Sequence, residues 1–305
     1  MQRFTVLKWM ISVGVICYVV YEFYTKFNWG FSSFDFQRLS SGQLVSLVLN
    51  ILILGAVNIV IEAVKWRYLM KPFEPINWRT AFSSVFTGLS LAVITPNRIG
   101  DLAGKAYQLK STSKLKGLCI ALLGHAAQFV CIFIIGAFAM NSFFSIQQFY
   151  FKIILTVLSI FVFVLYLKLD KFINWLGQFS FFIKSKMAFE GLEIFGFKQK
   201  MYLLFLSLLK YQVFVGQFYL LLVLFGVEIT IDKALNALFC TYFVQLFVPS
   251  FLLLELGVRG AAALYFIGHY ATMASAILLA SYILWVLNIG LPALIGLYFF
   301  NKKTD

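Results

Sequence analysis

The chain has 305 residues, of which 62% are hydrophobic and 12% charged, with a formal net charge of +13 and a mean hydropathy of +0.90. A soluble domain is roughly 25% charged, so this composition excludes a soluble enzyme, a disordered chain and a fibrous protein. The apolar residues form continuous runs of about 20 rather than alternating with polar residues, which is typical of membrane-spanning helices and not of a membrane β-barrel. The sequence therefore predicts an all-α integral membrane protein, with residues 1–305 as one membrane domain.

Six apolar segments are predicted to cross the membrane completely. In chain order they are 6–23, 44–64, 117–140, 153–167, 201–225 and 273–300. The first segment begins beside two basic residues, Arg3 and Lys8, and lacks a small-residue cleavage site, so we expect a retained span rather than a signal peptide.

Two further apolar segments, 81–95 and 234–254, are interrupted at Pro96 and Pro249. Proline removes a backbone donor and clashes with the preceding turn, so a helix rarely continues through it unchanged. We expect these segments to form re-entrant hairpins that return to their starting side. The alternative is that the two prolines only kink two ordinary spans.

The distribution of basic residues favours the hairpins. If every apolar segment crossed, the basic segments 98–116 and 168–200 would lie outside, against the positive-inside rule. With two opposed hairpins, 19 of the 25 Lys and Arg residues lie inside. This arrangement places both termini in the cytoplasm, and we expect the membrane to be a bacterial inner membrane. The aromatic and basic segment 168–200 joins the halves 1–167 and 201–305 and is expected in the cytoplasmic interface.

The two interrupted segments resemble each other, because each is followed by a glycine, an acid and a base four residues after the acid. Paired, interrupted segments in the two halves of a membrane protein are typical of inverted repeats that form a transporter's binding site. The residues expected to break the helices are Pro96, Gly100, Pro249 and Gly257.

The charged residues after each proline are the candidate binding residues. A helix that restarts after a break offers free N–H groups and a positive dipole end, and an arginine can bind phosphate through two parallel N–H groups. We expect Arg98 and Arg259 to hold an anionic lipid head group, and Asp101 and Glu255 to neutralise them when the site is empty. Lys105 follows Asp101 by four residues and can pair with it on one helical face. The alternative is that the pairs only stabilise the hairpins.

Four other polar residues are candidates for the lining of a cavity: His125, Gln128, Lys210 and Gln245. His125 with Gln128 also fits a hydrogen bond between helices, and Lys210 also fits a side chain that extends to the cytoplasmic interface. Glu62, near a span end, is expected at the interface.

The sequence contains no HExxH, GxSxG or Walker A motif, and its cysteines lack zinc-ligand spacing. We therefore expect no catalytic residues, no metal and no cofactor. The basic residues flank apolar segments, so we expect them to contact membrane lipids and not nucleic acid.

Three stretches resemble a known family. ITPNRIGDLAGKAYQL (94–109) is similar to the P-G-R-x-G-E…R-A-Y-x-L motif of the flippase-like family that includes the transmembrane region of lysylphosphatidylglycerol synthetases. VPSFLLLELGVRGAAALYFIG (248–268) is similar to that family's second motif, P-x-S…G-x-G-V-R-E-x-A…G, and KWRYLM (65–70) to its segment after the second span. The resemblance implies a polytopic protein that handles lipids, with flipping of aminoacylated or glycosylated lipids in its relatives.

The chain departs from these motifs at several positions. Asn97, Asp101 and Lys105 replace the usual glycine, glutamate and arginine, and Gly260 stands where the second motif has an acid. Head-group specificity therefore does not carry over. Because no soluble aminoacyl-transferase domain is seen before Asp305, synthetase activity is not expected.

These observations favour a flippase-like transporter that moves a phospholipid or lipid-linked glycan between two broken hairpins. The alternatives are an intramembrane lipid-modifying transferase and a non-transporting subunit that acts with a membrane or cytoplasmic lipid-modifying enzyme.

Overall fold

The computed structural model describes residues 39–95, 98–144, 149–176, 191–248 and 253–301. Within these ranges the chain is helical and contains no strand, which confirms the predicted all-α class.

Five long helical stretches are apolar enough to cross a membrane, which indicates an integral membrane protein. Each coincides with one of the six predicted spans, and the sixth, 6–23, lies outside the described residues. The five are α2 (Ser41–Met70), α5 (Lys114–Phe143), α6 (Phe149–Leu167), α9 (Phe197–Leu224) and the stretch formed by α12 (Ala274–Trp285), the π-helical η6 (Val286–Gly290) and α13 (Leu291–Asn301).

Local sequence explains where two of these helices begin. The Ser40 hydroxyl accepts a hydrogen bond from the Gln43 N–H while the Gln43 side chain accepts one from the Ser40 N–H, a capping box that starts α2. The Ser113 hydroxyl caps α5 in the same way through the Lys116 N–H. The last long stretch runs through Pro292 by means of the wider turn of η6, which takes up the hydrogen bonding that proline interrupts.

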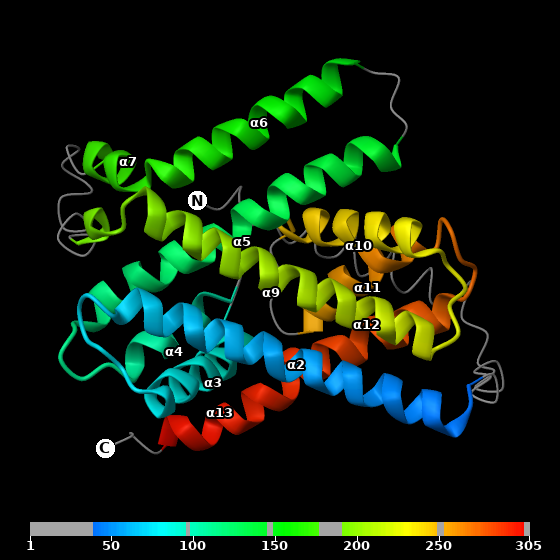
Figure 1. Cartoon of the computed structure of the whole chain (residues 1–305), viewed down its shortest axis with the longest axis horizontal. Helices are drawn as coiled ribbons and strands as arrows, with labels where there is room; N and C mark the ends of the chain where they lie inside the picture. Colours follow the sequence, from blue (N-terminus) through cyan, green and yellow to red (C-terminus); the bar gives the residue numbers. More distant parts are fainter. Residues whose placement is uncertain (1–38, 96–97, 145–148, 177–190, 249–252, 302–305) are drawn as a thin grey trace.

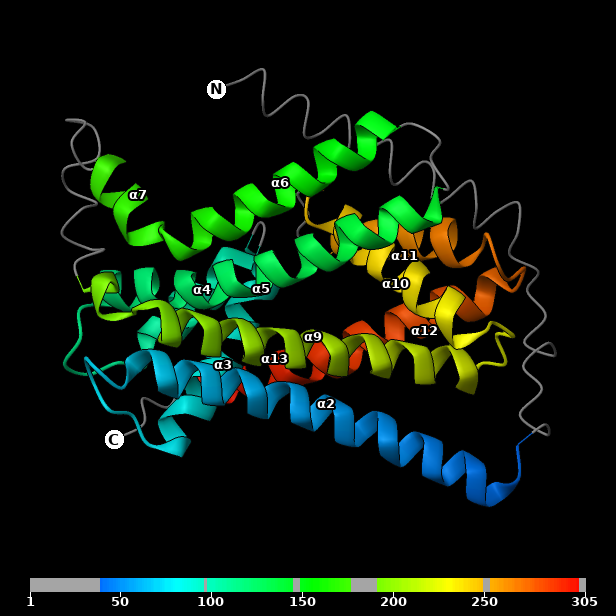
Figure 2. The same ribbon diagram turned by 45° about the horizontal axis from the view of Figure 1, so that its top comes forward.

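Two pairs of shorter helices lie among the long ones: α3 (Trp78–Ile94) with α4 (Ile99–Tyr107), and α10 (Ile231–Gln245) with α11 (Leu253–Ile267). These helices have 17, 9, 15 and 15 residues. Each is therefore shorter than the ~20 residues that cross the hydrocarbon core. The members of each pair pack against each other. The α3–α4 pair lies toward one end of the long helices and the α10–α11 pair toward the other (Figures 1 and 2).

Glycines set the close approach of α4 to α3. A Cβ on Gly104 would collide with the backbone of Gly88, and a Cβ on Gly100 would collide with the Leu91 carbonyl group. The Gly100 N–H donates to the Thr95 hydroxyl at 2.7 Å, so the start of α4 is tied to the end of α3. This tight packing fixes the orientation of the charged side chains on α4.

Two hydrophobic cores flank these pairs. One is built around buried Trp66 from α2 with α3, α4 and the first half of α5, and the other around buried Phe218 from α9 with α10, α11 and α12. In contrast, α6 packs mainly against α5, at the edge of the bundle (Figure 2). Most of its apolar side chains are exposed, as expected for a helix that faces lipid.

The interfacial segment 168–200 is described only at its two ends. It contains α7 (Leu169–Leu176) and a short 3-10 helix, η5 (Leu192–Ile194). Lys200 forms an ion pair with Asp170, which joins the start of α9 to α7.

Candidate functional site

Apart from Lys200, which pairs with Asp170, the buried charged residues of the described chain belong to two clusters. The Glu62 cluster comprises Glu62, Lys65, Asp101, Lys105, His125 and Lys210, which come from α2, α4, α5 and α9. The Glu255 cluster comprises Arg98, Glu255 and Arg259, which come from the start of α4 and from α11.

Glu62 is the centre of the first cluster. Its Oε1 atom lies 2.6 Å from the Lys105 ammonium, and its Oε2 atom lies 2.5 Å from that of Lys210 and 3.8 Å from that of Lys65. The same Lys105 ammonium lies 2.8 Å from Asp101 Oδ2 and is 2% exposed. Lys105 is therefore held by two carboxylates from two helices, which offsets the cost of burying its charge.

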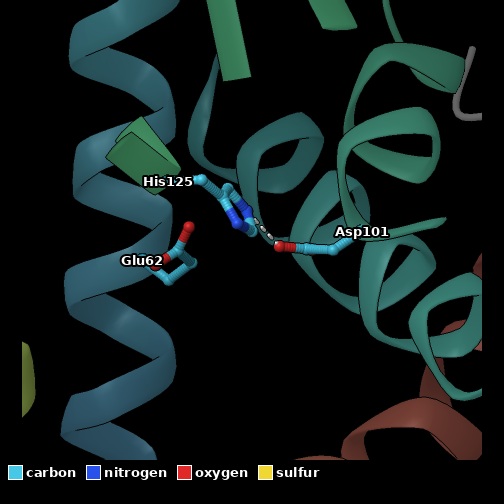
Figure 3. A group of neighbouring side chains, drawn as sticks. All are labelled: Glu62, Asp101 and His125. Carbon is cyan, nitrogen blue, oxygen red and sulfur yellow. Dashed lines mark hydrogen bonds and ion pairs between the residues drawn. The ribbon is translucent and has the colours of Figure 1, made fainter. Parts of the chain in front are cut away.

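His125 joins this cluster through Asp101. Its Nε2 atom lies 2.7 Å from Asp101 Oδ2, so Nε2 carries a hydrogen and the carboxylate accepts it. Figure 3 shows the imidazole directed at Asp101, with Glu62 approaching from the facing helix. The His125 side chain is 38% exposed, the largest exposure in this cluster.

The donor atoms of Glu62, Asp101 and His125 lie within 4.8 Å of one another, a spacing that would suit a metal ion. However, the Lys105 ammonium contacts all three, at 2.6, 2.8 and 3.5 Å. A lysine of the chain thus takes the place that a cation would need, and Lys65 and Lys210 add two more positive charges. We assign no metal to this cluster.

Glu62 has partners that the sequence analysis did not name. Its side chain is 13% exposed, and α2 continues for eight residues beyond it to Met70. Its basic partners on α4 and α9 are 43 and 148 residues away in the chain, so no local pattern could identify them. The one local signal was Lys65, three residues later.

The other predicted cavity residues have different outcomes. Lys210 pairs with Glu62. Gln128 and Gln245 join neither cluster, and within the described residues the buried Gln128 Oε1 and Gln245 Nε2 atoms have no hydrogen-bond partner. His125 makes a hydrogen bond between helices, to Asp101 on α4.

The Glu255 cluster connects the two short-helix pairs. Arg98 Nη2 lies 2.8 Å from Glu255 Oε1 and Arg98 Nε lies 3.2 Å from Oε2, a two-point contact between residues 157 apart in the chain. Arg259 Nη2 donates to Glu255 Oε1 at 3.1 Å from one helical turn away. Arg98 is the N-cap of α4 and the one non-glycine residue with positive φ, 57°, in the described chain.

Arg259 has hydrogen-bonding capacity that the described residues do not use. The residue is 4% exposed, yet its Nε and Nη1 atoms have no hydrogen-bond partner in the described part of the chain. Its guanidinium carbon lies 5.7 and 5.9 Å from the ring centres of Phe214 and Tyr242. Buried donors without acceptors are costly, so this geometry suits a ligand that supplies acceptor oxygens.

The structure thus separates residues that the sequence placed in one site. The pairs Asp101–Lys105 and Glu255–Arg259 form as predicted. However, Glu255 alone neutralises Arg98, while Asp101 and Lys105 belong to the Glu62 cluster.

Two predictions about helix-breaking residues are corrected, and two lie outside the described residues. Gly257 lies inside α11 and does not interrupt it. Gly100 is the second residue of α4, so the break precedes it. Pro96 and Pro249 fall outside the described ranges.

The sequence did not reveal a cavity of about 390 Å³ near the C-terminal end of α2. The Arg67 guanidinium lies 4.0 Å from the Trp78 ring centre in its wall, and Lys71, Tyr68 and Tyr202 also line it. None of its lining residues belongs to the two charged clusters.

Comparison of the chain with family models, with curated proteins and with solved structures finds no match.

Proposed function

We propose that the protein is a flippase-like lipid transporter that binds an anionic head group at the Glu255 cluster. The observation that carries this proposal is buried Arg259, which is paired to Glu255 through one nitrogen and keeps two nitrogens, Nε and Nη1, without hydrogen-bond partners in the described chain. Two guanidinium groups and one carboxylate give the cluster a net charge of +1, which favours an anion. Phosphate oxygens match the parallel donors of arginine.

The proposed topology treats α3–α4 and α10–α11 as opposed re-entrant hairpins related as an inverted repeat. Their helices are short, and they lie toward opposite ends of the long helices (Figure 1). The ion pair between Arg98 and Glu255 joins them. Binding sites between broken helices of two repeats are typical of transporters.

The proposed orientation places the C-terminal ends of α2 and α6 and the N-terminal ends of α5 and α9 in the cytoplasm. These ends lie together in Figure 1. Many basic residues of the described chain flank them, as the positive-inside rule requires. The basic residues near these helix ends are Lys71, Arg79, Lys110, Lys114, Lys116, Lys168, Lys171 and Lys198. The family resemblance of the motifs at 94–109 and 248–268 supports a bacterial cytoplasmic membrane and a phospholipid or lipid-linked glycan as substrate.

A second candidate function is an intramembrane lipid-modifying transferase, because the contact between Asp101 and His125 is one that orients a general base. Its weakness is the lack of a nucleophile: the hydrogen-bond partners of His125 among the described residues are Asp101 and Lys105. The third is a non-transporting subunit of a lipid-modifying complex.

Transport of a tagged anionic phospholipid in proteoliposomes tests the proposal. Lysine keeps the charge but lacks the parallel donors. Losing one charge-assisted hydrogen bond of about 1.5–3 kcal/mol predicts a reduction of about tenfold or more for Arg259→Lys and Arg98→Lys. The matched control is Arg79→Lys, at an exposed arginine outside both clusters, which should transport at the wild-type rate.

The outcomes separate the candidates. Wild-type transport in both Arg98→Lys and Arg259→Lys would make these arginines structural ion-pair partners only. No transport by wild-type protein that elutes as a single species would overturn the transporter proposal and favour the transferase or the subunit.

A further inference from the structure

One short helix carries residues of both charged clusters. Arg98 is the N-cap of α4, Asp101 lies in its first turn and Lys105 in its last turn. Arg98 contacts Glu255, whereas Asp101 and Lys105 contact His125 and Glu62. Because α4 is a continuous helix of nine residues, a displacement of the helix that moves Lys105 would also displace Arg98.

We propose that the contact between His125 and Asp101 is a proton-binding site, and that proton binding there is coupled through α4 to head-group binding at the Glu255 cluster. The inference rests on the proposed transport function and deepens it by naming the proton as the co-transported ion.

The geometry of His125 suits a proton acceptor. Since Nε2 donates its hydrogen to Asp101 Oδ2, the neutral ring has no hydrogen on Nδ1, and Nδ1 can accept one. The side chain is 38% exposed, so the described residues do not enclose it. Imidazole is the side chain that ordinarily exchanges a proton near neutral pH. The step forms one N–H bond at Nδ1 and breaks one O–H bond of a hydronium ion, which leaves as water; no bond of the protein breaks.

The side chains that face His125 already carry a net positive charge, to which the proton adds. They are Glu62 and Lys65 on α2, Asp101 and Lys105 on α4, and Lys210 on α9. Three ammonium groups and two carboxylates give a net charge of +1 around a neutral imidazole. Two other helices, α6 and α10, also pack on α5. Their charged residues lie only in their first turns: Lys152 on α6, and Asp232 and Lys233 on α10.

Protonation places two cations on one carboxylate. The Lys105 ammonium lies 3.5 Å from His125 Nε2, and both share Asp101 Oδ2. Like charges at this distance repel strongly away from bulk water, so a protonated imidazole favours a position of α4 in which Lys105 lies further from it. Arg98 then moves relative to Glu255. A bound anionic head group offsets the added positive charge, so proton and head group bind with positive cooperativity.

Lipid-linked proton uptake tests the coupling directly. Dihexanoyl phosphatidylglycerol, which is short-chained and anionic, is added to purified full-length protein near neutral pH in two buffers of different ionisation enthalpy, and the heat of binding is measured. We expect wild-type protein to take up protons on binding, so that the heats differ between the buffers. His125→Gln should bind the lipid with the same heat in both. The matched control is His269→Gln, at the exposed second histidine, which should behave as wild type.

Transport in proteoliposomes gives the second measurement. With the membrane potential clamped, an imposed pH gradient should change the wild-type and His269→Gln transport rates at least about threefold, and leave the rate of His125→Gln unchanged. Binding or transport by the wild type without proton uptake or gradient dependence overturns the coupling and leaves the lipid-transport proposal standing. Absence of both binding and transport in the wild type overturns the transport proposal, and the coupling falls with it. The wild-type comparison needs no variant, so it decides whether the two binding events are coupled even if His125→Gln fails to fold. Proton uptake that persists in folded His125→Gln overturns the assignment to His125.

Discussion

The two charged clusters contain the same local motif, an acid followed four residues later by a base. They differ in how many carboxylates contact the base. Lys105 is held by Asp101 and by Glu62, at 2.8 and 2.6 Å. Arg259 is held by Glu255 alone, and two of its buried nitrogens have no partner in the described chain. The base of the first pair is therefore fully neutralised by neighbouring carboxylates, whereas the base of the second pair keeps N–H groups that can bind a ligand. The motif predicts that two charges pair, and the surrounding helices determine whether the pair is structural or can bind a ligand.

The choice of base fits this difference. An ammonium is a compact charge that three neighbouring oxygens can satisfy, while a guanidinium presents five donors in a plane. A single carboxylate cannot use all of the donors of Arg259, even with Glu255 one turn away. Arginine at this position thus keeps capacity for a second anion, and lysine at 105 does not.

The largest expected effect on stability follows from removing Glu62, the centre of the Glu62 cluster. Glu62→Ala leaves Lys65, Lys105 and Lys210 with the single carboxylate of Asp101. Breaking a buried ion pair costs about 3–5 kcal/mol, so we expect a loss of folded yield and a clear drop in unfolding temperature. Thermal unfolding in detergent measures it. The exposed Arg79→Ala should change stability by about 0.5 kcal/mol or less. Equal effects of the two variants would contradict a central role for Glu62.

A smaller effect on stability is expected in the Glu255 cluster. Arg259→Ala leaves Glu255 still paired to Arg98, so the cost is below that of Glu62→Ala. A double-mutant cycle of Arg259→Ala with Glu255→Ala should give a coupling free energy of about 1–3 kcal/mol, measured by unfolding. A double variant as unstable as the sum of the two singles would show that the pair contributes nothing.

The smallest effect concerns a carboxylate held without a cation, outside the spans. Glu74 accepts hydrogen bonds from the backbone N–H groups of Lys110, Ser111 and Thr112 at 2.7–3.0 Å. Burial raises the pKa of its carboxyl group, but these hydrogen bonds outweigh that effect and hold the pKa at about 2. A depressed pKa stabilises the fold above the ordinary value of 4.5, and this contribution is lost as the pH falls toward 2.

The unfolding temperature between pH 6 and pH 3 tests the Glu74 contacts. Wild-type protein should lose more stability over this range than Glu74→Gln, because the amide cannot be protonated there. Arg79→Gln, which removes an exposed charge that does not titrate in this range, serves as the control and should follow the wild type. Identical pH profiles for wild type and Glu74→Gln would show that the three backbone contacts are not maintained in solution.

The elements that the sequence predicted depend on local composition, and those it missed depend on packing. Hydropathy located five spans, and spacing located the pairs Asp101–Lys105 and Glu255–Arg259. The acid that faces Arg98 could not be chosen from spacing, since Asp101 and Glu255 are equally suitable in sequence. Its identity depends on how α4 lies against α11.

Glycine was equally ambiguous in the sequence. Gly100 is required because the Leu91 carbonyl lies where a side chain would be, whereas a Cβ on Gly257 would meet nothing within 4 Å. Both follow a proline, and both were expected to break a helix. Only the arrangement of the neighbouring helix distinguishes a glycine that permits close contact from one inside an ordinary turn.

The position of Lys210 has a consequence for biosynthesis. It pairs with Glu62 from 148 residues further along the chain, so the ribosome makes α2, α4 and α5 well before this lysine exists. Until then, Glu62 and Asp101 face Lys65 and Lys105, and their formal charges cancel. The nascent helices can thus associate in the bilayer as an electrically balanced group. The excess positive charge arrives only with α9, after the earlier helices have been inserted.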